Sequence, residues 1–201
     1  MRLGTDLRSR LRVATQDAHG RMHLHPGFRA AAAGSLTLAE YRDLLARLFG
    51  FHEAFDAAFP SAPAAFARAI DLHARSRSEA LAQDLAALGV APRIPALPLC
   101  ATAPRPKSEP QWLGALYVTE GSTLGGAQIA RALEALGIGE DGRRFFTAYG
   151  DLRSAMWRLF LARLETWAED PEASAEVEAS ALAAFESFEV WMRDWAGAAE
   201  R

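Results

Sequence analysis

The stretch Gly121-Ser122-Thr123-Leu124-Gly125-Gly126 lies inside a segment, residues 111–136, that otherwise has the pattern of one long amphipathic helix. Three glycines in a helix interior each cost about 1 kcal/mol relative to alanine. A chain accepts that cost where another group must approach the helix backbone, or where the helix must bend. Gly121 and Gly125 are four residues apart and therefore open the same face. The gap predicted above them suits a flat, rigid object.

The rest of the chain is also helical in pattern. Alanine, leucine and arginine dominate, β-branched residues are scarce, and no long segment alternates with period two. The sequence predicts an all-α fold of about seven helices, a multi-helix bundle in which residues 1–201 form one domain. The predicted helices cover residues 6–24, 28–33, 37–60, 63–88 with a break near 75–78, 111–136, 143–149, 151–168 and 173–195.

Several helix ends have recognisable signals. Thr5 is the expected N-cap of the first helix, and Thr37-Leu38-Ala39-Glu40 is a capping box that opens a later one. Pro26-Gly27 is the expected stop of the first helix. Six prolines between residues 92 and 110 predict a stiff connector at the surface.

Composition and charge exclude several classes of function. The 201 residues include 22 basic and 25 acidic side chains, so there is no basic field that would attract nucleic acid. No run approaches the ~20 apolar residues of a membrane span, and no secretory signal is recognised. Cys100 is the single cysteine, which excludes an internal disulfide and a cysteine metal cluster. We therefore expect a cytoplasmic protein without nucleic-acid or membrane partners.

His19 is the candidate metal ligand. It follows Ala18 and borders the apolar stripe of the first predicted helix, so its imidazole can face an apolar slot as a single axial ligand. Arg12 precedes it by two helical turns, about 10.5 Å, and can reach an anionic group at the edge of the same ligand. The alternative is that Arg12 and His19 are merely solvated neighbours. His23 follows His19 at the i+4 spacing of a paired metal site, but no third ligand stands at a companion spacing.

Arg158 follows Trp157 on a later predicted helix. It is either a surface arginine lying along apolar neighbours or a second clamp on an anionic ligand. Other sites are excluded by their patterns. No Glu-x-x-His repeat of a di-iron bundle is present, the glycine stretch lacks the lysine of a phosphate loop, and no flavin or nicotinamide fingerprint is found.

Two stretches resemble a known family. The run from Leu11 to His19, Leu-Arg-Val-Ala-Thr-Gln-Asp-Ala-His, resembles the proximal helix of heme oxygenases, and the run from Leu116 to Gly126, Leu-Tyr-Val-Thr-Glu-Gly-Ser-Thr-Leu-Gly-Gly, resembles their distal helix. The likeness is strongest to the bacterial branch that supplies bilin to bacteriophytochromes, which residues 145–165 also follow. The resemblance spans roughly residues 7–195.

The resemblance implies a role for each matched residue. His19 matches the axial ligand of the heme iron. Gly121 and Gly125 match the glycines over the opposite heme face, and Gly126 extends them. Arg12 and Arg158 fall where the family places basic residues near the heme propionates.

The resemblance also implies a reaction. Heme b is both cofactor and substrate, it is opened with O2 to biliverdin, carbon monoxide and ferrous iron, and an external ferredoxin or reductase supplies electrons. A bacteriophytochrome is the implied acceptor of the bilin. One departure is Ser122, which stands where many heme oxygenases have an aspartate that orders water, so proton delivery falls to water, Ser122, Thr123 or another group.

Two alternatives stay open. A non-catalytic heme carrier or sensor on the same fold would also lack the acid that Ser122 replaces. An enzyme of the related thiamin-degrading type shares the helical architecture but normally uses a cysteine nucleophile in the core, whereas Cys100 lies in the proline-rich connector. This alternative ranks below the others.

Overall fold

The computed structural model describes residues 6–193 and 195, and these residues form helices joined by turns, as predicted. The α-helices are α1 Leu7–Ala14, α2 Gln16–Leu24, α3 Pro26–Ala33, α4 Leu38–Asp56, α5 Ala64–Ala69, α6 Ser78–Ala87, α7 Glu109–Ala135, α8 Arg153–Glu165 and α9 Pro171–Met192. Short 3-10 helices are η1 Phe59–Ser61, η2 His73–Arg75, η3 Ala91–Ala96, η4 Glu140–Gly142 and η5 Gly150–Leu152.

The glycine-containing helix, α7, is unbroken. It begins after Ser108, whose hydroxyl accepts a hydrogen bond from the N–H of Gln111, and it stays α-helical through all three glycines. The glycines therefore do not end the helix. What lies against each glycine decides whether it serves the approach of another group.

The start of the chain differs from the prediction. Asp6 is the N-cap of α1, because its carboxylate accepts a hydrogen bond from Ser9 N at 2.7 Å; Thr5 lies outside the described residues. The predicted first helix is two helices, since Thr15 is in a turn between α1 and α2. Pro26 does not merely stop α2 but occupies the first turn of α3, where its missing N–H costs nothing.

The short helix predicted over residues 143–149 is wrong, and the segment is a series of turns. The carboxylate of Asp84 in α6 accepts hydrogen bonds from the backbone N–H groups of Arg144 and Phe145, at 2.8 and 2.9 Å. Tyr149 then has a left-handed φ of 64°. The contacts with Asp84 hold the segment in its path along α7 and prevent it from forming a helix.

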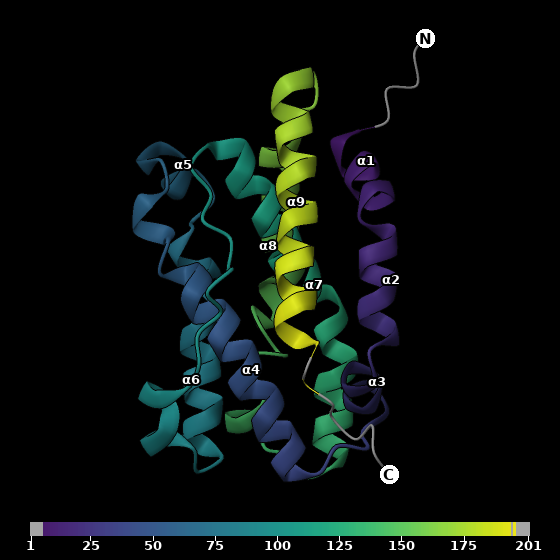
Figure 1. The fold of residues 1–201 in the computed structure, drawn as a ribbon, viewed down its shortest axis with the longest axis vertical. Coiled ribbons are helices and arrows are strands. Elements are labelled where there is room, and N and C mark those ends of the chain that lie inside the picture. The colour runs from purple at the N-terminus through teal and green to yellow at the C-terminus, as the bar shows by residue number, and fades with distance from the viewer. Residues whose placement is uncertain (1–5, 194, 196–201) are drawn as a thin grey trace.

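The long helices α7 and α9 form the centre of the molecule. They pack closely because Gly114 has no side chain; a Cβ there would overlap the carbonyl oxygen of Val177. Figure 1 shows α1 and α2 on one flank of α9, with α4 and α6 on the other. None of the helices over residues 6–193 is both long and apolar enough to cross a membrane.

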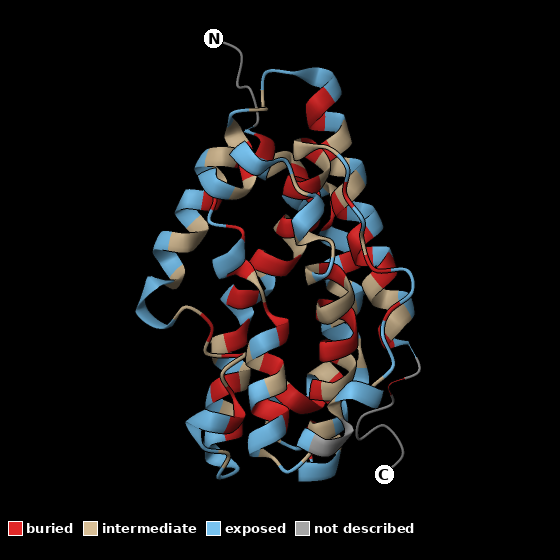
Figure 2. Ribbon diagram, turned by 90° about the vertical axis from the view of Figure 1, so that its left-hand side faces the viewer, coloured by how far each residue is buried: buried red, intermediate tan, exposed pale blue. Residues whose placement is uncertain are grey.

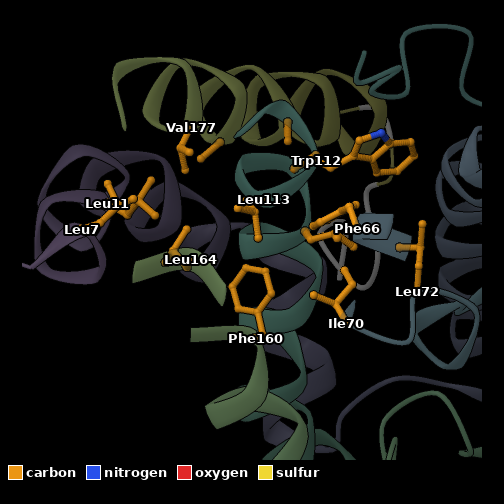
Figure 3. Close-up of a cluster of buried hydrophobic side chains, with 14 of the residues drawn as sticks. Leu7, Leu11, Phe66, Ile70, Leu72, Trp112, Leu113, Phe160, Leu164 and Val177 are labelled. Atoms are coloured by element: carbon orange, nitrogen blue, oxygen red, sulfur yellow. The ribbon is translucent and has the colours of Figure 1, made fainter. Parts of the chain in front are cut away.

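Two apolar clusters hold the helices together. One joins α1, α7, α8 and α9, with Leu7 and Leu11 at one end and Trp112 towards the other (Figure 3). The other joins α3, α4, α6 and the second half of α7 around Tyr41, Leu44 and Leu133. The buried positions lie on the inner sides of the helices, as Figure 2 shows. Helix α2, which carries His19, contributes no buried residue to either cluster.

Candidate functional site

The start of α1 is tied to the end of α8. The carboxylate of Glu165 accepts hydrogen bonds from the backbone N–H groups of Leu7 and Arg8, each at 3.0 Å. A carboxylate at a helix N-terminus satisfies donors that have no partner within the helix and favours its dipole. This contact fixes where α1, and after it α2, runs along the molecule.

Two further contacts align α2 and α3 with α7. The first is between Thr15 and the phenol of Tyr117. The second lies further along the chain, where a Cβ built at Gly34 would be 3.4 Å from the Cβ of Ala132. The two segments therefore run in the same direction between these contacts. His19 is one helical turn beyond Thr15, and Gly121 is one turn beyond Tyr117. By the same count, His23 and Gly125 are each two turns beyond that contact.

The His19 side chain is exposed overall, but its ring has defined neighbours. It lies edge-on to Phe185 of α9, with ring centroids 6.4 Å apart, and edge-on to His23, at 4.4 Å. Partial burial lowers the pKa of His19 below its ordinary value of 6.5, and the charge on His23 lowers it further. The imidazole is therefore neutral near pH 7, which is the form that binds a metal ion.

The glycines of α7 fall into two groups. A Cβ built at Gly121 or at Gly125 meets no atom within 4 Å outside the helix itself, so both open onto free space. Gly126 is different, since it is buried and a Cβ there would lie 2.9 Å from the carbonyl oxygen of Phe146. Gly126 thus allows the 143–149 segment to approach α7, while Gly121 and Gly125 present bare backbone.

The hydroxyl groups beside the glycines are engaged by their own helix. Ser122 Oγ donates to the carbonyl of Thr119 at 2.7 Å, and Thr123 Oγ1 donates to the carbonyl of Glu120 at 2.7 Å. Ser122 is exposed and Thr123 is buried. The Ser122 proton is therefore in use, but its oxygen lone pairs can still accept a hydrogen bond.

A buried ionic network is centred on Glu120, the residue before Gly121. Glu120 accepts from Arg75 Nη1 at 2.6 Å and from the Tyr149 hydroxyl at 2.7 Å, and the Arg75 and Glu120 side chains are at most 1% exposed. Arg75 also donates to the carbonyl groups of Ile70 and Met156. The network links α7 to α8 and fixes how α7 is rotated about its axis.

The two arginines matched by the resemblance are both exposed, Arg12 at the end of α1 and Arg158 in α8. Neither forms an ion pair with any residue of the described part of the chain. The charge of Arg12 is close enough to Tyr117 to lower its pKa, against the burial that raises it, and Trp157 beside Arg158 packs on the same phenol. Arg12 and Trp157, the residue before Arg158, therefore both lie near Tyr117.

Other features lie apart from this site. A surface groove between α2 and α9 is lined by Ala18, Met22, Leu182 and Val190 among others, but not by His19. Cys100 is buried, with its Sγ 3.9 Å from the Ser187 hydroxyl. Within residues 6–193 and 195, no group of three or more histidine, cysteine or acidic side chains is arranged to hold a metal ion.

The sequence reasoning missed the contribution of Tyr117 and Phe185. Tyr117 was detectable, because it precedes Gly121 by one helical turn just as Thr15 precedes His19. Phe185 comes from α9, and no local signal relates it to His19.

Known proteins resemble this chain in sequence and in fold. The family model described as heme oxygenase matches residues 5–194. A heme oxygenase of Xanthomonas campestris pv. campestris (strain 8004) is 38% identical over 115 residues, which cover 57% of this chain and 66% of that protein.

Two solved structures are similar over nearly the whole chain. The heme oxygenase from Neisseria meningitidis, in its NO- and CO-bound structures, superposes with a TM-score of 0.76 at 26% identity and covers 94% of this chain and 92% of its own. Heme oxygenase-1 from the cyanobacterium Synechocystis sp. PCC6803, solved in complex with heme, gives a TM-score of 0.67 at 17% identity over 95% and 94% of the two chains, which supports the fold.

Proposed function

Since this chain belongs to the heme oxygenase family, we propose that it degrades heme, binding it between His19 and the Gly121–Gly125 face of α7. Membership in the family supports enzymatic activity. The observation that supports the proposal is the open backbone at Gly121 and Gly125, one and two turns past Tyr117, while His19 is one turn past Thr15, which interacts with Tyr117. When bound there, heme supplies the iron that activates O2 and the macrocycle that is opened to biliverdin, with release of carbon monoxide and ferrous iron.

The residues present fit a heme group. His19 offers a neutral imidazole as axial ligand, and the missing side chains at Gly121 and Gly125 leave room for a flat ring against the opposite helix. Phe185 adds an apolar wall beside the imidazole. Gly126 has the separate role of admitting the Phe146 backbone, so it supports the site from behind.

Arg12 and Arg158 hold the two propionates in this proposal. Both are exposed cations without an internal partner among the described residues, so pairing with carboxylates requires no existing contact to break. A charge-assisted pair between arginine and carboxylate also fixes the rotation of the ring in its plane.

Ser122 positions water in place of an acid. Its proton goes to the Thr119 carbonyl, so the hydroxyl oxygen accepts a hydrogen bond from water rather than donating its own proton. Proton delivery then runs through that water. Electrons come from an external ferredoxin or reductase, and the bilin passes to an acceptor such as a bacteriophytochrome.

The test is a single-turnover reaction with the whole protein. Hemin is added at one equivalent, and the complex is reduced in air and, as the control, under nitrogen. We expect the Soret absorption to be lost in air only, with bilin absorption appearing and carbon monoxide released. A complex that keeps its Soret band through reduction in air contradicts the proposal and favours the carrier or sensor that the Ser122 substitution also fits.

A further inference from the structure

His23 has no role in the proposed heme site, although it contacts His19, the proposed axial ligand. Its Nε2 lies 3.3 Å from the Nε2 of His19, and both side chains are exposed. The two residues stand four apart in α2, an unbroken helix from Gln16 to Leu24, so the helix itself sets their spacing.

We propose that His19 and His23 form a chelating site for a divalent transition cation, with Zn²⁺ as the probe, in the heme-free protein. Two nitrogens that each lie about 2.0–2.1 Å from a tetrahedral zinc ion are roughly 3.3 Å apart. The observed Nε2–Nε2 separation of 3.3 Å equals that span, so a cation can be held with small rotations of the two rings.

The chemistry of the pair selects the class of cation. Imidazole nitrogen suits Zn²⁺, Cu²⁺ and Ni²⁺, whereas Mg²⁺ and Ca²⁺ prefer oxygen ligands. No third histidine, cysteine or acidic ligand is arranged at the pair in the described residues, so water completes the coordination. The site is therefore open and exchangeable.

The surrounding charges do not oppose a cation. Arg21, on the same helix, is held by Glu189 of α9, with its Nε 2.6 Å from Oε1 and its Nη2 2.9 Å from Oε2. Its charge is thus neutralised by a two-point ion pair. The partial burial that lowers the pKa of His19 acts in the same direction, because it keeps the imidazole deprotonated.

One consequence rests on the proposed function. His19 Nε2 cannot bind heme iron and Zn²⁺ at the same time, so the two ligands are mutually exclusive if His19 is the axial ligand. Zinc binding itself does not depend on that assignment. A divalent cation bound at the pair would then reduce the amount of heme that the protein binds.

The experiment is calorimetric titration of the heme-free protein, residues 1–201, with Zn²⁺ at pH 7.5. We expect one zinc ion per chain. His19→Ala and His23→Ala should each weaken binding by at least about tenfold, which corresponds to about 1.4 kcal/mol. His73→Ala is the matched control, since His73 is also exposed but lies in η2, and it should bind as the wild type does.

Mg²⁺ should give no heat in any variant. Absence of zinc binding in the wild type, or equal binding in His23→Ala, overturns the proposal. A circular dichroism spectrum shows that each variant is folded, which is expected because both histidines are exposed.

A second arm separates this proposal from the proposed function. Hemin is titrated into wild type and His23→Ala with and without saturating Zn²⁺. Zinc should weaken hemin binding in the wild type and have at least about tenfold less effect in His23→Ala. If the protein degrades hemin but does not bind zinc, only the zinc-site proposal is contradicted. If the protein binds zinc at the pair but neither binds nor degrades hemin, only the proposed function is contradicted.

Discussion

At the scale of single residues, the structure separates glycines that serve packing from glycines that serve an open surface. Gly114 and Gly126 are closed in by the backbone of Val177 and Phe146. Gly121 and Gly125 have nothing within 4 Å of a built Cβ. Of the four glycines in α7, only the second pair carries the cost of glycine in a helix without a contact inside the protein that explains it.

This distinction predicts opposite effects of one type of substitution. Gly121→Ala and Gly125→Ala should each stabilise the heme-free protein by about 0.5–1 kcal/mol, because alanine favours the helix and meets no atom. Both should lower the rate of heme degradation, since a methyl group then occupies the open face. Urea unfolding without heme and single-turnover kinetics with heme measure the two effects.

The packing glycines are the control. Gly114→Ala should destabilise the protein by about 1–3 kcal/mol, because its Cβ overlaps the Val177 carbonyl and the helices must separate. Gly121→Ala and Gly125→Ala variants that unfold as easily as Gly114→Ala would mean that the space above them is filled.

His52 predicts a pH dependence of stability. It is 4% exposed, its Nδ1 has no hydrogen-bond partner among the described residues, and burial, with the charge of Arg77, lowers its pKa to about 3. Between its ordinary pKa of 6.5 and about 3, the unfolded chain binds a proton that the folded chain does not. The stability that depends on neutral His52 is therefore fully present above pH 6.5 and is lost as the pH decreases below that value.

The expected contribution approaches about 1.4 kcal/mol per pH unit below pH 6. The measurement is the free energy of unfolding from pH 7 to pH 4.5 for the wild type and for His52→Gln, which does not titrate. As the pH falls, the free energy of unfolding should decrease more for the wild type than for His52→Gln. Parallel curves would show that His52 titrates normally.

At the scale of helices, the rotation of α7 depends on the buried network of Arg75, Glu120 and Tyr149. Glu120→Ala should destabilise the protein by about 3–5 kcal/mol, because it leaves the Arg75 guanidinium buried without its carboxylate. The double variant Arg75→Met with Glu120→Leu should recover much of that loss, since no charge is then buried unpaired. Thermal or urea unfolding of the three proteins gives the comparison.

If Glu120→Ala costs less than about 1 kcal/mol, water reaches the network and it does not fix α7. Heme binding by the double variant provides a second readout. A rotated α7 would present side chains rather than Gly121 to the ring, so affinity for heme should fall even where stability is restored.

The sequence predicted most helices, and it failed where tertiary contacts override local pattern. The capping box at Thr37 is a local signal, and it is confirmed. The 143–149 segment has helical composition, but Asp84 binds its backbone N–H groups and the segment follows α7 instead. The break at Thr15 was also missed, because the spacing of apolar residues continues through it.

At the scale of the whole molecule, the site is made by elements far apart in sequence. His19 and the glycines were found from spacing, because each belongs to a pattern within one helix. Their relation was not predictable from spacing, since it depends on Tyr117 meeting Thr15 and on Glu165 holding the start of α1. Figure 1 shows how α9 lies beside both α7 and α2, so that Phe185 reaches His19.

The measurement that tests the central claim most directly is the absorption spectrum of the ferric heme complex of His19→Ala, with and without added imidazole. The wild type should give the spectrum of an imidazole-ligated heme, and His19→Ala should lose it and regain it when imidazole fills the space left by the side chain. A His19→Ala complex whose spectrum and heme affinity equal those of the wild type would contradict the account, because the heme would then be held elsewhere.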